Sequence, residues 1–341
     1  METPLATDLV QPAPGAPLPA LRPMSAGELL DRALQLFRTH FARLFIVMLT
    51  FQAPMYALFK SVMNQSAAFL RQSAGGQVPE ISALLWLLGK LVGFLFLAMT
   101  LYQLAVASLT TGAARAYLGE KIEAGTALWE GLKRAPHLVG TFLVLLLWCV
   151  FNLGLATLPG LGIAAASFLV PPSGTRLTII FGGSAVVLVL QVVVMLYLLL
   201  RYALVSEVVV IEKRSFVGAM RRSAQLMSGR IGPTFVDNCK IRLSILYAVN
   251  FCISLSVLVV TSIPNALVNS AYGVSPFDPE RFDPALVPLW ASVPVDVLGV
   301  LAQSAVAPFG LLAVIVFYFD LRIRKEGFDL ELLASRMGNG S

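Results

Sequence analysis

Side chains that could support catalysis are scarce in this chain of 341 residues. Metal-assisted hydrolysis needs histidines and carboxylates that converge on one ion, yet the sequence has only His40 and His137, each without a paired carboxylate pattern nearby. The motifs HExxH, GxSxG and GxxxxGKS/T do not occur. The three cysteines lack the paired spacing of a disulfide framework or a zinc site. We therefore predict a non-enzymatic protein with no catalytic, cofactor-binding or metal-binding residues.

Lys90 is the most unusual charge, because it lies within an apolar run, nine residues after Ile81. A charge inside a membrane span is costly and commonly functional. Its long side chain could extend toward the membrane surface or pair with another helix, or it could face a polar cavity. Gln103, Gln191 and Gln303 could line such a cavity, although amides in spans also hydrogen-bond between helices. These four residues form a candidate intramembrane polar site.

A basic arm over residues 201–242 contains the second candidate site. Arg221, Arg222 and Arg230 could contact anionic lipid headgroups at the inner leaflet, or they could serve only to orient the chain in the membrane. Arg201 and Glu207 lie at the cytoplasmic end of the fourth expected span, with Glu212 close by, and could pair with the arginines of the arm. The alternative is an ordinary interfacial charge network.

The composition indicates that these sites belong to a membrane protein. Hydrophobic residues make up 57% of the chain and charged residues only 13%, and the mean hydropathy is +0.79. A typical soluble domain is about one-quarter charged. The expected partners are membrane lipids, further copies of the chain or other membrane proteins, and nucleic acid is not expected among them.

Long uncharged runs predict an all-α, polytopic fold with six transmembrane helices. The expected spans are residues 41–62, 81–111, 138–158, 177–204, 243–263 and 289–319. They define a membrane domain over residues 24–319, between a disordered Pro-rich tail (1–23) and a cytoplasmic amphipathic tail (320–341). Ser25 and Glu28 predict a capping box at the start of the first helix. Pro159 and Pro264 are expected to end the third and fifth spans.

The distribution of Lys and Arg predicts the orientation of the chain. Nineteen of the 25 lie on the side of both termini and four on the opposite side, so the positive-inside rule places both termini in the cytoplasm. Basic amphipathic segments at 33–43, 127–137 and 219–230 are expected to form interfacial helices on that face. Their spacings of 94 and 92 residues fit a threefold repeat of interfacial helix plus hairpin. The alternative is that any cytoplasmic flank is basic and amphipathic.

Three stretches carry a resemblance to a known family: LRPMSAGELLDRALQLFRTHF from residue 21, IEKRSFVGAMRRSAQLMSGR from residue 211 and YFDLRIRKEGFDLELLA from residue 318. They resemble the bacterial membrane proteins of the glycerophosphoryl diester phosphodiesterase membrane-domain-like family, and the likeness covers nearly all of the chain after residue 20. It implies a multi-spanning fold in the bacterial cytoplasmic (inner) membrane, without the catalytic domain to which such membrane domains are sometimes fused.

These observations favour a scaffold or accessory factor in envelope or lipid homeostasis, with cytoplasmic arms that contact lipid. The alternative is a transporter or channel for a small solute or lipid, with a polar path near Lys90. A lipid-modifying enzyme is the third hypothesis, and it would need a carboxylate, histidine and metal cluster that the sequence does not display.

Overall fold

The computed structural model describes residues 23–74, 81–117, 124–169, 174–214, 216–232, 237–274 and 286–327. Within these ranges the chain is built from eight α-helices and no strands: α1 (Ala26–Ala74), α2 (Ile81–Tyr117), α3 (Ala124–Ser167), α4 (Gly174–Arg201), α5 (Val205–Ile211), α6 (Phe216–Leu226), α7 (Cys239–Ala271) and α8 (Leu289–Glu326). Six stretches of the described chain are long and apolar enough to cross a membrane. The prediction of an all-α, polytopic fold with six spans is confirmed. The predicted terminal tails lie outside the described residues over 1–22 and 328–341.

Prolines do not end the spans where the sequence predicts breaks. The expected ends at Pro159 and Pro264 are wrong, since α3 continues to Ser167 and α7 to Ala271. In a bilayer no water replaces a lost backbone hydrogen bond, so a helix that continues past a proline leaves fewer polar groups exposed than one that stops there. At the first helix, the predicted capping box is confirmed: the Ser25 amide donates to Glu28 at 2.7 Å, and the Glu28 amide donates to Ser25 Oγ at 3.3 Å.

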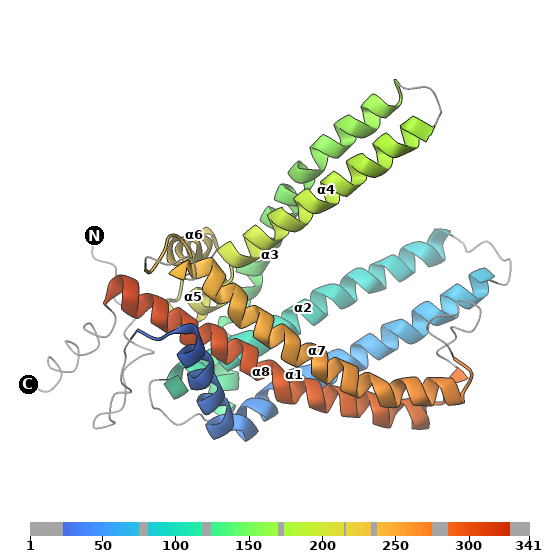
Figure 1. The fold of residues 1–341 in the computed structure, drawn as a ribbon. Coiled ribbons are helices and arrows are strands. Elements are labelled where there is room, and N and C mark those ends of the chain that lie inside the picture. The colour runs from blue at the N-terminus through green and yellow to red at the C-terminus, as the bar shows by residue number, and fades with distance from the viewer. Residues whose placement is uncertain are drawn as a thin grey trace, which may run out of the picture.

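Three helical hairpins, α1–α2, α3–α4 and α7–α8, extend from one end of the molecule (Figure 1). The α3–α4 hairpin diverges from the other two along its length, and the short helices α5 and α6 lie at the common end (Figure 1). We call this end the hub. It comprises the first turns of α1 and α7, the last turns of α2 and α8, and helices α5 and α6.

The hub contains most of the buried core. Leu29, Leu109, Leu204, Phe317 and Tyr318 each have at most 1% of their surface exposed, although they come from three different helices and a turn. Away from the hub, the spans expose large apolar side chains along α2, α3, α4 and α7. Such surfaces are stable against lipid chains and would aggregate in water.

A buried ion pair joins three chain segments within the hub. Asp320, fully buried in α8, accepts a hydrogen bond from Arg242 Nη1 of α7 at 3.2 Å and one from the backbone amide of Met24 at 2.8 Å. Arg324 also donates to Asp320 at 3.1 Å and to the Met24 carbonyl at 2.8 Å. Residue 320, where the sequence predicts a separate tail to begin, is therefore part of the core.

A second charge network fixes α6 to the end of α8. Arg222 of α6 donates to Glu212 at 2.8 Å and to Glu326 at 2.8 Å, and the Tyr318 hydroxyl donates to Glu212 at 2.9 Å. Burial by itself lowers the pKa of Arg222, but the hydrogen bonds and charges of Glu326 and Glu212 outweigh it and raise that pKa above its ordinary value. The guanidinium therefore stays charged and paired.

Candidate functional site

A cavity of about 990 Å³ opens between α1, α2, α7 and α8. Its walls are largely apolar, with Met55, Phe59, Phe94, Leu255 and Val300 among the lining residues. Its polar side chains come chiefly from α1, α7 and α8: Gln52, Tyr56, Ser254, Thr261, Ser262, Asn265, Asn269, Asp296 and Gln303. A large apolar pocket with a few placed polar groups is the usual form of a small-molecule site.

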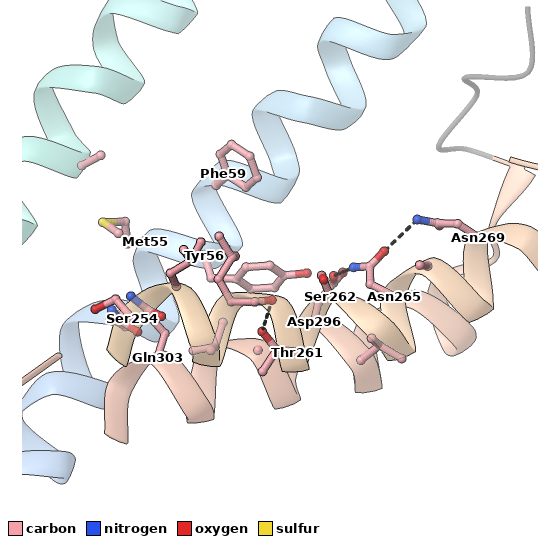
Figure 2. Close-up of a pocket in the computed structure, with 18 of the residues that line it drawn as sticks. Met55, Tyr56, Phe59, Ser254, Thr261, Ser262, Asn265, Asn269, Asp296 and Gln303 are labelled. Atoms are coloured by element: carbon pink, nitrogen blue, oxygen red, sulfur yellow. Dashed lines mark hydrogen bonds between the residues drawn. The ribbon is translucent and has the colours of Figure 1, made fainter. Parts of the chain in front are cut away.

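The polar groups gather at the end of the cavity remote from the hub. Asp296 forms an ion pair with Lys60, whose Nζ lies 2.7 Å from Asp296 Oδ2, and only 12% of the Asp296 side chain is exposed. Asn265 Nδ2 donates to Asp296 Oδ1 at 3.2 Å, and Asn269 Nδ2 donates to Asn265 Oδ1 at 2.7 Å (Figure 2). We call Lys60, Asn265, Asn269 and Asp296 the polar head. Asn265, Asn269 and Asp296 line the cavity, and Lys60 lines an adjoining pocket of about 190 Å³ that shares these three residues.

Tyr56 points from α1 toward the polar head (Figure 2). Its hydroxyl is buried beside the Asp296 carboxylate, within reach of a hydrogen bond to it, but the geometry in the described part of the chain leaves that bond incomplete. A buried hydroxyl without a partner costs about 1–3 kcal/mol. The hydroxyl is therefore available to a ligand that enters the cavity.

The opposite end of the cavity lies nearer the hub and is more sparsely polar. Gln303 lies two helical turns beyond Asp296 along α8, about 10 Å away at 1.5 Å per residue. Its neighbour Ser304 donates to Gln52 Oε1 at 2.8 Å, which joins α8 to α1. An acidic and a basic group at one end, followed by apolar walls, match an amphiphile with a charged head and a hydrocarbon body.

Lys90 lies outside this cavity. Its side chain is exposed on α2, where Nζ donates to Gln65 Oε1 of α1 at 2.8 Å and lies 5.2 Å from the centre of the Trp86 ring. These contacts support structural pairing between α1 and α2, the first of the alternatives for this residue. They give no support to a polar path at Lys90.

The three glutamines of the candidate polar site are separated as well. Gln303 lines the first cavity, whereas Gln103 lines a second cavity of about 300 Å³ closer to the hub. Gln191 is half-buried on α4 and lines neither cavity. The structure therefore does not bring Lys90, Gln103, Gln191 and Gln303 into one site.

The three candidate headgroup contacts of the basic arm differ in accessibility. Arg222 forms ion pairs with Glu212 and Glu326 inside the hub, so its charge is already neutralised by protein carboxylates. Arg221 and Arg230 are exposed. Arg221 borders a groove of about 600 Å³ with Trp148, Phe151 and Tyr202 among its lining residues.

Sequence reasoning missed the polar head and did not separate Glu207 from Glu212. Asp296 is the only acidic residue in the expected span 289–319, and a lone acidic residue inside a span is enough to mark it as a candidate site residue. Lys60 lies 236 positions away from it in the chain, so no local pattern connects the two. Both were expected near the arginines of the arm, yet only Glu212 pairs with arginines, and Glu207 lies buried in the second cavity.

The described residues contain no group of three or more His, Cys, Asp or Glu placed to hold a metal ion.

Comparison with family models, with curated proteins and with solved structures finds no match to this chain. The fold and the cavity by themselves define the class: an all-α, multi-pass membrane protein with a cavity of amphiphilic character between its helices.

Proposed function

We propose that this protein is a non-enzymatic protein of the bacterial inner membrane that holds a membrane lipid between α1, α2, α7 and α8. In this role it acts as an accessory factor in envelope or lipid homeostasis, with the hub and both termini on the cytoplasmic side. The resemblance in sequence to membrane-domain-like proteins agrees with this location. The observation that carries the proposal is the ion pair of Lys60 and Asp296, which lies where the apolar cavity adjoins a small polar pocket.

The polar head favours a zwitterionic lipid headgroup. Lys60 offers an ammonium to a phosphate, and Asp296 offers a carboxylate to an amine, so each pole of phosphatidylethanolamine has a charged partner. The buried Tyr56 hydroxyl supplies a further donor to the phosphate. An anionic lipid without an amine would leave Asp296 facing like charge, which disfavours it.

Lipid binding can be measured by native mass spectrometry of the purified protein after exchange into defined lipids. We expect the wild-type chain to retain phosphatidylethanolamine in preference to phosphatidylglycerol. Lys60→Met and Asp296→Asn should each weaken retention about fivefold to tenfold, or about 1–1.4 kcal/mol, because each removes one charged partner.

Lys90→Met is the matched control, since it also removes a lysine ammonium from a spanning helix, but Lys90 lines neither the cavity nor the adjoining pocket of Lys60. It should leave lipid retention unchanged. Equal retention of both lipids by the wild-type chain, or equal loss in the Lys60 and Lys90 variants, would count against a lipid site at the polar head.

Lipid transport is the second candidate, and the alignment of the two cavities favours it. They share the faces of α2, α7 and α8: Ala98 and Gln303 line the first, and Tyr102 and Ala307 line the second one turn away. Together they extend from the polar head toward the hub. Transport predicts faster movement of fluorescent phosphatidylethanolamine between leaflets of proteoliposomes, and an unchanged rate would restrict the function to binding.

A further inference from the structure

The second cavity is lined by an acidic residue that lies outside the proposed lipid site. It encloses about 300 Å³ between α2, α3, α5, α7 and α8, at the edge of the hub. Its contributions from α3 and α8 are apolar, and Lys and Arg are absent from its described lining. Glu207 of α5 is the acidic group in that lining, and only 1% of its surface is exposed.

Glu207 has no basic partner within the described chain. Its Oε2 accepts a hydrogen bond from Ser206 Oγ at 2.9 Å, whereas nearby Glu212 is paired with both Arg222 and Arg214. A buried carboxylate without a counter-charge costs several kcal/mol, so it must either bind a proton or bind a cation.

Oxygen atoms suited to a cation lie around the same cavity. Asn250 Oδ1 of α7 is buried and accepts no hydrogen bond from the described residues. The Asn250 amide packs directly on α8 at Gly310, where an added Cβ would lie 2.6 Å from Asn250 Oδ1. Gln103, 4% exposed, and the hydroxyl-bearing Tyr102 line the cavity from α2.

We infer that this cavity binds a small monovalent cation between the Glu207 carboxylate and the Asn250 amide oxygen. One negative charge with neutral oxygen donors balances one positive charge. Divalent cations ordinarily take several carboxylates in protein sites, and the described chain offers no acidic or histidine cluster for one. The inference does not depend on lipid binding in the first cavity, because the two lining sets share no residue.

The test is thermal unfolding of the purified full chain in detergent, titrated with NaCl, KCl or ethanolamine hydrochloride. Choline chloride keeps the ionic strength constant. We expect at least one small cation to raise the Tm of the wild-type protein along a saturating curve. Glu207→Gln should abolish this rise, since it removes the negative charge and keeps the size of the side chain. Asp31→Asn, at an exposed acidic residue of α1, should keep the wild-type curve.

Gly310→Ala provides a variant that changes no charge. The added methyl group displaces the Asn250 amide, so the cation concentration at half-saturation should rise about threefold or more. A packing defect alone would lower the Tm at every concentration without shifting the midpoint. If Glu207→Gln does not accumulate as folded protein, the wild-type and Gly310→Ala titrations decide the question. A wild-type Tm that is the same in all four salts overturns the inference and shows that Glu207 is buried in its protonated form.

Discussion

Asp320→Ala is expected to lower the free energy of unfolding by about 3–5 kcal/mol, because it leaves a buried arginine without its counter-charge. Arg242, with 4% of its side chain exposed, would lose its carboxylate partner, and the Met24 amide would lose its acceptor. Arg324 would also be released, although it is 23% exposed and can turn toward water. Thermal unfolding in detergent and resistance to protease measure the change.

Asp31→Ala is the matched control for this prediction, since it removes the same residue type from an exposed position of α1. Its expected effect is within about 0.5 kcal/mol. The double variant Arg242→Met/Asp320→Leu removes both charges together and should recover part of the loss. If Asp320→Ala matched Asp31→Ala, the buried pair would contribute nothing to the hub, and apolar packing alone would hold the three segments together.

The number and order of the membrane spans could be predicted from the sequence, because each span depends on the local composition of the chain. Each span is a long, predominantly apolar run, and lipid forces such a run into a helix whatever its neighbours are. The same physics explains the error at Pro159 and Pro264, where rules learned from soluble proteins predict an end but the helix continues. The span count was therefore predictable, and the ends near prolines were not.

The candidate sites could not be predicted in this way, because they depend on contacts between distant segments. Lys60 and Asp296 meet only when the first and last hairpins pack together. Lys90 is conspicuous in the sequence and yet lies on an exposed face with Gln65 and Trp86. Glu207 and Glu212 are only five positions apart in the chain, yet only Glu212 pairs with arginines. Glu207 lies within α5 and Glu212 directly after its last residue, so which of the two acids is paired depends on how α5 packs in the folded chain.

Gly131→Ala is expected to destabilise the protein by about 1–3 kcal/mol, since it overpacks a close contact between α2 and α3. A Cβ at residue 131 would lie 2.7 Å from the Ser108 Cα and 2.8 Å from the Ser108 amide nitrogen. Backbone atoms cannot turn aside as a side chain can, so the two helices would have to separate. Gly154→Ala, in the same helix with no atom within 4 Å of the added Cβ, should change stability by no more than about 1 kcal/mol.

The same junction carries a charge pair, which allows packing and electrostatics to be compared at one place. Arg115 of α2 lies 2.6 Å from Glu130 of α3, and each side chain remains 27% exposed. Glu130→Gln should therefore cost less than about 1 kcal/mol, as for other solvent-accessible pairs. A larger loss in Glu130→Gln than in Gly131→Ala would mean that charge sets the distance between α2 and α3. The reverse order would mean that the diverging α3–α4 hairpin is held to the hub by close backbone packing at Gly131.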